Sequence, residues 1–257
     1  IFAKVNAADR LRAALSSPSY EPLSLNIGSA TDAYQPAERK LGITRAVIGV
    51  LSEFRHPFSV ITKSAGIERD IDLMAPMAAE GLAAAYVSIT TLDGGLARIL
   101  EPRASMPERR LRTIERLAQA GIPVGVSVSP VIPFINEPEI ERILEAAAHA
   151  GASRAFSIVL RLPWEVNPLF QQWLGQHYPE RAKRVMARIH DMRGGRDNDP
   201  QFGSRLTGHG LWAELIRQRF DKCVARLGLN KQRFELDLSK FARPPGPRAD
   251  NAQQSLF

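Results

Sequence analysis

Cysteine is nearly absent from this sequence. Cys223 is the only cysteine among the 257 residues, so the chain cannot form an internal disulfide. A single thiol also excludes any metal site that needs several cysteines from this chain alone. Proteins with so few thiols are typical of reducing compartments, and the composition therefore predicts a cytoplasmic location.

Long hydrophobic runs are missing as well. No apolar stretch approaches the roughly 20 residues of a membrane-spanning helix, and no basic-then-apolar leader opens the chain. An apolar content of 44% with 24% charged residues instead predicts a globular protein with a full-sized core. The chain opens at Ile1, inside an amphipathic segment, which we interpret as the start of a fragment of a longer protein. A processed mature terminus is the alternative.

Acidic residues are scarce in the last third of the chain. Residues 1–180 carry 18 Lys/Arg and 19 Asp/Glu, whereas residues 181–257 carry 16 and 8. The net charge of +7 therefore comes entirely from the last third. Clustered positive charge suits a polyanion such as nucleic acid, although a solvated helical face with a basic tail would explain it too.

Short apolar runs alternate with amphipathic segments of helical spacing. The strand-like runs are residues 22–28, 58–64, 83–93, 122–133 and 152–163. The helical segments are residues 7–15, 42–54, 68–81, 106–121 and 137–151, and three of them close on Gly81, Gly121 and Gly151. Such alternation predicts parallel strands joined by right-handed crossovers.

Five strand–helix units can be counted, whereas a complete (β/α)₈ barrel has eight. We therefore predict an α/β fold, a partial parallel (β/α)₆ barrel without its first strand, over residues 1–165. A helical extension is predicted for residues 166–230, with helices at 167–192 and 211–229 around a Gly- and Asp-rich loop. Residues 231–257 form a basic, Pro-rich tail that we predict to be mostly disordered.

Polar side chains gather where the predicted strands end. In parallel α/β folds the carboxyl ends of the strands carry the functional site. The candidate binding residues there are Gly28, Ser29, Thr31, Asp32, Lys63, Ser88, Thr90, Ser127, Ser129 and Arg161. Because this rim offers hydroxyls and two cations but no histidine, it predicts binding of a polar ligand rather than hydrolysis. No catalytic residue is assigned.

Lys63 is open to three interpretations. It could form a Schiff base, as in an aldolase-type barrel enzyme, or pair with a ligand carboxylate. It could also form a salt bridge across the barrel mouth, for example with Asp32. Gly28 and Ser29 would let backbone amides approach a charged ligand group, or they simply form a turn at the strand end.

Several strings resemble a known family. They are "GSATDAYQPAE" (28–38), "ITKS" (61–64), "VSITTLD" (87–93), "LEPRASMPERRLRTIERLAQAGIPVGVSVSPVIPFIN" (100–136) and "RLPWEVNPLFQQWL" (161–174). Together they resemble the radical S-adenosylmethionine (SAM) superfamily. Within it they are similar to the bacterial spore-photoproduct-lyase-like proteins, often labelled DNA repair photolyase. The resemblance runs from Ile1 to the tail.

The resemblance implies which residues would bind SAM. The region Gly28–Asp32 matches the segment that holds the methionine amino group, and Lys63 matches a lysine near the methionine carboxylate. Ser88 matches a serine that contacts the ribose. The strand that carries Ser127 and Ser129 matches one that lines the adenine.

The chain departs from the family in one large respect. The family's C-x₃-C-x₂-C loop, whose thiolates bind a 4Fe–4S cluster, precedes a segment resembling "IFAKVNAADRLRA", and no such loop occurs here. Without the cluster no electron reaches the sulfonium and no 5′-deoxyadenosyl radical forms. We expect an inactive fragment of a radical SAM enzyme. Its full-length parent would hold SAM and, through upstream ligands, the iron–sulfur cluster, and would act on nucleic acid as a lyase in DNA repair.

The tail supports an alternative. "QQSLF" (253–257) resembles the Q-x-x-L-F pentapeptides that dock bacterial proteins onto the replication sliding clamp. Leu256 and Phe257 would be apolar anchors, with Gln253 as a hydrogen-bonding group. The alternative function is therefore a non-catalytic protein that binds nucleic acid or the sliding clamp on a cluster-free barrel.

Overall fold

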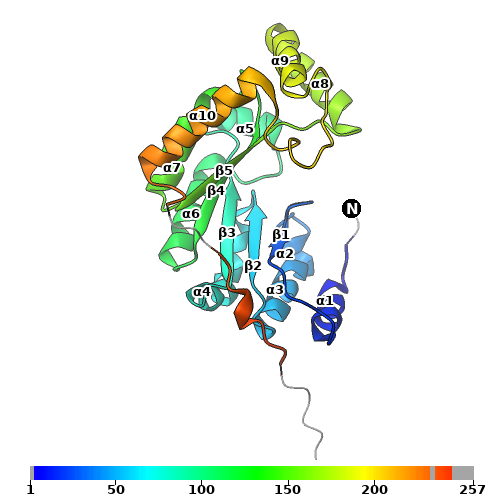
Figure 1. The fold of residues 1–257 in the computed structure, drawn as a ribbon, viewed down its shortest axis with the longest axis vertical. Helices are drawn as coiled ribbons and strands as arrows, with labels where there is room; N and C mark the ends of the chain where they lie inside the picture. The colour runs from blue at the N-terminus through cyan, green and yellow to red at the C-terminus, as the bar shows by residue number, and fades with distance from the viewer. Residues whose placement is uncertain (1–2, 232–234, 245–257) are drawn as a thin grey trace, which may run out of the picture.

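The computed structural model describes residues 3–231 and 235–244. In them five parallel strands form one sheet in sequential order (Figure 1). The strands are β1 (Leu25–Ile27), β2 (Phe58–Thr62), β3 (Ala83–Ser88), β4 (Val124–Val131) and β5 (Arg154–Val159). The sequential order of parallel strands confirms the partial barrel.

Helices connect the strands and cover one face of the sheet. They are α1 (Ala7–Ser16), α2 (Glu38–Leu41), α3 (Ile43–Glu53), α4 (Ile71–Ala79), α5 (Gly94–Leu100), α6 (Pro107–Gln119) and α7 (Ile140–His149), with 3₁₀ turns η1 (Ala65–Asp70) and η2 (Glu137–Glu139). The glycines at 81, 121 and 151 adopt positive φ, as predicted for helix ends. The short helices α2 and α5 were not predicted, because so few residues carry no clear helical period.

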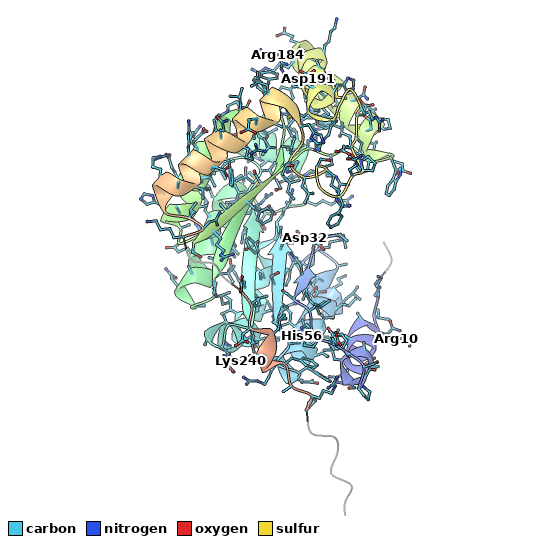
Figure 2. The ribbon with its side chains drawn as sticks, viewed as in Figure 1. Arg10, Asp32, His56, Arg184, Asp191 and Lys240 are labelled. Atoms are coloured by element: carbon cyan, nitrogen blue, oxygen red, sulfur yellow. The ribbon has the colours of Figure 1, made fainter. Side chains whose placement is uncertain are left out.

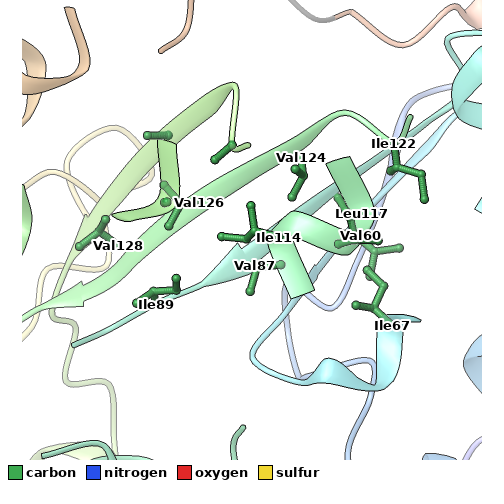
Figure 3. Close-up of a cluster of buried hydrophobic side chains, with 14 of the residues drawn as sticks. Val60, Ile67, Val87, Ile89, Ile114, Leu117, Ile122, Val124, Val126 and Val128 are labelled. Atoms are coloured by element: carbon green, nitrogen blue, oxygen red, sulfur yellow. The ribbon is translucent and has the colours of Figure 1, made fainter. Parts of the chain in front are cut away.

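The two faces of the sheet differ in chemistry. Val60, Val87 and Val126 point to the helix-covered face, where Ile114 and Leu117 of α6 pack on them (Figure 3). Residues of the other parity face the inside of the partial barrel, and they are mostly small or polar. The larger side chains on this inner side include Ile61, Tyr86 and Phe156, and the rings of Tyr86 and Phe156 meet edge to face with centroids 5.2 Å apart.

The C-terminal extension differs from the prediction in one respect. The stretch 167–192 is not one helical segment but two helices, α8 (Val166–His177) and α9 (Pro179–Met192). Pro179 lacks the N–H that a continuing helix needs, so it begins the second helix instead. Helix α10 (Gly210–Leu227) packs along α7 and contributes Phe220 to the main core. None of the helices described is long and apolar enough to span a membrane.

The C-terminal segment returns to the amino ends of the strands. It includes η3 (Leu238–Lys240), and the amide of Asp237 donates to the carbonyl of Gly81 (3.0 Å). Figure 2 shows Lys240 near His56, at the end of the molecule away from Asp32. The segment therefore closes the base of the barrel and leaves the carboxyl ends of the strands to the functional site.

Candidate functional site

A pocket of about 700 Å³ opens at the carboxyl ends of β1 and β2. Its wall comes from the loop after β1, the residues after β2 and the loop that follows α5. The polar residues that line it are Thr31, Asp32, Tyr34, Gln35, Lys63, Ser64, Glu101 and Arg103. Three of the predicted binding residues, Thr31, Asp32 and Lys63, are thus brought together.

Asp32 fastens the first loop to β2. Its Oδ1 accepts hydrogen bonds from the Thr62 hydroxyl (2.7 Å) and the Tyr34 amide (2.8 Å), and its Oδ2 accepts from the Lys63 amide (2.7 Å). The carboxylate is therefore occupied by the protein's own donors. Asp32 positions the backbone of the pocket, and the suggested salt bridge between it and the Lys63 ammonium is not formed.

Gly28 makes a close approach of two strands possible. Its φ is +96°, and a Cβ atom there would overlap the carbonyl oxygen of Ile61 on β2. The absence of a side chain is therefore required by the neighbouring strand. Ser29 and Thr31 are exposed beyond this turn, and Thr31 Oγ1 accepts a hydrogen bond from Gln35 (2.5 Å).

The Lys63 ammonium pairs with Glu101. Its Nζ contacts Glu101 Oε1, and it also lies 3.5 Å from Thr90 Oγ1 and 3.4 Å from the Ser129 carbonyl oxygen. Thr90 donates a further hydrogen bond to Glu101 (2.6 Å). Because Lys63 already forms an ion pair with a carboxylate, this geometry favours the interpretation of Lys63 as a cation that pairs with anionic groups.

Arg110 supports Glu101 from inside the protein. Its side chain is fully buried, and it donates to Glu101 Oε2 (2.6 Å) and to the carbonyls of Ser88 (2.9 Å) and Ser105 (2.6 Å). Burial alone would raise the pKa of Glu101, but Lys63 and Arg110 outweigh it and hold that pKa below its usual value. Two cations around one carboxylate leave a net positive charge beside the pocket.

Ser88, Ser127 and Ser129 lie next to this ion cluster on β3 and β4. Ser88 pairs with Ser127 in the register of the two strands, and both are buried. The Ser127 hydroxyl donates to Ser129 Oγ (2.9 Å), just before the cis peptide that links Ser129 to Pro130. These hydroxyls form the predicted polar patch on the neighbouring strands.

Seven of the ten predicted binding residues do not line the pocket, and Arg161 lies on a different edge of the sheet from it. The other six are Gly28, Ser29, Ser88, Thr90, Ser127 and Ser129. Arg161 follows β5, on the opposite edge of the sheet from β1. Glu101 and Arg110, in turn, were not assigned a role from the sequence. The string "LEPRAS" was the available signal, but nothing local shows that its glutamate reaches a lysine 38 positions earlier.

Two further side chains are structural. The Tyr34 hydroxyl donates to buried Asp70 (2.9 Å), and burial together with that carboxylate raises its pKa far above the ordinary range. Cys223 is buried in α10, where burial raises the pKa of the thiol. In residues 3–231 and 235–244 no cluster of three or more His, Cys, Asp or Glu side chains could hold a metal ion.

Residues 24–147 match the family model described as "Radical SAM superfamily". An uncharacterized protein of Mycobacterium bovis is 31% identical over 186 residues, which is 72% of this chain and 55% of that protein. An uncharacterized protein of Methanocaldococcus jannaschii is 26% identical over 157 residues, 60% of this chain and 56% of that protein. The chain thus spans about half the length of the curated relatives it matches.

The solved structure of spore photoproduct lyase complexed with dinucleoside spore photoproduct shares the fold. The TM-score is 0.60 at 13% identity, and the match covers 89% of this chain and 66% of that one. A variant of the same lyase with bound AdoMet matches with a TM-score of 0.57 at 12% identity. The radical SAM family model thus accounts for residues 24–147, and the structural match shows that the chain shares the fold of the lyase.

Proposed function

We propose that this chain is the SAM-binding part of a radical SAM enzyme. The observation that carries the proposal is the net positive charge that Lys63, Glu101 and Arg110 leave beside a polar pocket at the carboxyl ends of the strands. A zwitterionic amino acid moiety suits such a site, because its carboxylate can pair with the lysine while hydroxyls and carbonyls accept from its ammonium.

The residues of the pocket fit the methionine part of SAM. Lys63 would hold the carboxylate, kept in place by the Glu101–Arg110 pair. The exposed turn Gly28–Thr31 would receive the amino group through its backbone and hydroxyls, and Asp32 would orient that turn. Ser88 would face the ribose, and the strand that carries Ser127 and Ser129 would line the adenine. Arg161 was predicted to belong to this set, but it lies beyond the pocket wall, and no contact with SAM is proposed for it.

The cysteine content does not fit an iron–sulfur cluster. Cluster binding in this superfamily needs three thiolates, and this chain has only the buried Cys223. We therefore assign no reaction step through a cluster to these residues, and propose that the thiolates come from a segment outside these 257 residues. By itself this chain is proposed to be inactive in SAM cleavage.

SAM binding tests the assignment of the pocket. Substituting Lys63→Gln removes the cation that faces the carboxylate, and we expect affinity for SAM to fall by about tenfold or more, the weight of one charge-assisted hydrogen bond. Isothermal titration of the chain with SAM measures this. The exposed Lys222 on α10 offers the matched control Lys222→Gln. Equal affinity in both variants, or no binding by the wild type, would contradict the proposal.

Anaerobic reconstitution with iron and sulfide tests the cluster separately. We expect no 410 nm absorbance from this chain, and uptake of about four irons by a longer protein that carries the three cysteines. If the longer protein also took up no iron, the radical SAM chemistry would fail, although the SAM pocket could stand.

Nucleic acid is the proposed macromolecular partner, with lyase or repair-type chemistry for the parent enzyme. The basic last third of the chain supports it.

Docking on a sliding clamp through Gln253, Leu256 and Phe257 is proposed too, on residues that lie outside the described part of the chain. A cytoplasmic location is proposed from the single thiol. The lone cysteine also favours the second candidate function, a non-catalytic nucleic-acid-binding protein.

A further inference from the structure

The loop between α9 and α10, residues 193–209, holds polar groups without partners. Among the described residues, buried side-chain atoms that make no hydrogen bond include the Nε atoms of Arg161, Arg193 and Arg205 and the Oδ1 of Asn198. Arg161 directly follows the end of β5, and the other three lie in the loop. Buried polar groups are nearly always satisfied in proteins, so this concentration of unpaired groups sets the region apart from the rest of the described chain.

The three arginines lie close together. Arg193 donates to the carbonyl of Leu160 (2.7 Å), next to Arg161, and to the carbonyl of Arg205 (2.9 Å). Burial lowers the pKa of Arg193; nearby Asp199 opposes that shift, and the positive charge of Arg161 adds to it. The loop is therefore held against the end of β5, where the charges of Arg193 and Arg161 lie near each other.

The acidic residues of the loop are occupied by other partners. Asp199 accepts hydrogen bonds from the Ser204 hydroxyl and the Gln201 amide, and Asp197 accepts from Asn167 (2.6 Å). Exposed Arg196 forms no ion pair with any described residue, and it lines a depression of about 220 Å³ together with Arg193, Asp199 and His209. The region thus keeps an excess of positive charge.

Two aromatic side chains stand exposed beside these arginines. Phe202 in the loop is 83% exposed, and the Arg205 guanidinium lies 4.5 Å from its ring centroid. Trp164, three residues after Arg161, is 87% exposed and has a φ of +44°. The bond from Asn167 to the loop ties this turn in place. A large aromatic residue on a strained backbone, unburied, is better explained by a ligand than by packing.

We propose that Arg161 and Arg205, which flank the buried Arg193, bind a phosphate group of single-stranded nucleic acid, with Phe202 and Trp164 as surfaces on which the adjoining bases stack. The proposal rests on the nucleic-acid partner proposed above and gives it a site. Guanidinium groups suit phosphate oxygens. Single strands are the form chosen because only unpaired bases can offer their faces to aromatic side chains.

Fluorescence anisotropy with the full 257-residue chain tests this site. The probe is a labelled oligothymidylate of about 12 nucleotides, within the usual site size, alone or annealed to its complement, over a range of salt concentrations. Arg205→Gln and Arg161→Gln should each reduce the salt slope of binding by about 1. Phe202→Ser and Trp164→Ser should weaken binding by about tenfold with the slope unchanged. Arg217→Gln, an exposed arginine of α10, is the charge-matched control.

Each outcome is informative. If the chain binds the single strand but all variants behave like Arg217→Gln, this site is wrong and the nucleic-acid partner stands. Tighter binding to the duplex also overturns the site. If the chain binds no nucleic acid, both nucleic-acid proposals fail. The proposal of a SAM site is not affected by that result, because this assay contains no SAM. If Arg161→Gln does not fold, the variants Phe202→Ser and Trp164→Ser still test the site, because both side chains are exposed.

Discussion

Gly28 shows how a single residue shapes the mouth of the pocket. Its missing side chain admits the carbonyl of Ile61, and Asp32 then fastens the following turn to Thr62 and Lys63. The turn that would face a ligand is thus built by contacts within the protein. Its shape depends on one glycine and one carboxylate.

We expect Gly28→Ala to lower the free energy of unfolding by about 2–4 kcal/mol, because positive φ and the overlap with Ile61 both penalise a methyl group. Urea unfolding measures this. Gly175, exposed in the last turn of α8 with nothing within 4 Å of an added Cβ, provides the control. Gly175→Ala should be neutral or stabilise by up to about 1 kcal/mol. A loss of similar size in both variants would refute the close-approach explanation.

At the scale of elements, Arg193 makes the side-chain hydrogen bonds that attach the loop 193–209 to the end of β5. Arg193 is 2% exposed, and its two terminal nitrogens donate to the carbonyls of Val159, Leu160, Ser204 and Arg205. The Leu206 carbonyl in turn accepts from the Val159 amide (3.0 Å). A Gly-rich segment without helix or strand is thereby attached to the edge of the sheet.

Arg193→Lys should release this loop. One ammonium cannot reach four carbonyls, so buried acceptors stay unpaired at a cost of about 1–3 kcal/mol each. We expect faster tryptic cleavage after Arg196 and Arg205, followed by mass spectrometry, while other sites are cut as in the wild type. The replacement keeps a trypsin site at position 193, and Arg217→Lys on α10 is the control. Cleavage rates equal to the control would mean that the loop is held by other contacts.

At the scale of the whole molecule, residues 15–20 and 241–243 meet at the base of the barrel. Arg243 donates to the carbonyl of Leu15 (3.2 Å) and to that of Tyr20 (3.1 Å). The buried His56 lies between them: its Nε2 is 2.8 Å from the Tyr20 hydroxyl, and its ring packs edge-on against Phe241 at 5.5 Å. The base of the barrel is therefore closed by segments more than 200 residues apart.

This arrangement should make stability depend on pH. Burial lowers the pKa of His56 below its ordinary value of 6.5, so the unfolded chain binds the proton more readily than the folded one. The stabilising contribution of neutral His56 should therefore be complete above about pH 6.5. The free energy of unfolding should decrease as the pH falls from about 6.5 to the folded-state pKa of His56. Urea unfolding at pH 7.5 and 5.5 measures the loss.

The variant His56→Gln isolates this histidine, since the other titrating groups are common to both proteins. It should lose less stability than the wild type between the two pH values. If both proteins lose the same amount, the pH dependence comes from other groups, and His56 is not the group responsible.

The local pattern of the sequence was sufficient for the architecture. Apolar runs, helical spacing and the closing glycines Gly81, Gly121 and Gly151 predicted five strand–helix units, and the carboxyl-end rule placed Asp32 and Lys63 at the site. These features depend on residues within one or two turns of each other, where period and backbone preference determine the outcome. The break at Pro179 was missed because the helical period continues across it. The short helices α2 and α5 were missed because so few residues show no clear period.

The partners of the charged groups were decided by the tertiary structure alone. Lys63 pairs with Glu101 rather than with Asp32, Glu101 rests on the buried Arg110, and Arg161 lies away from the pocket beside the loop 193–209. An ion pair forms between whichever opposite charges the fold brings within a few ångströms, and those residues come from separate loops. Sequence spacing carries no information on such distances. The types of polar residue at the carboxyl ends of the strands could therefore be predicted from the sequence, but the ion pairs among them could not.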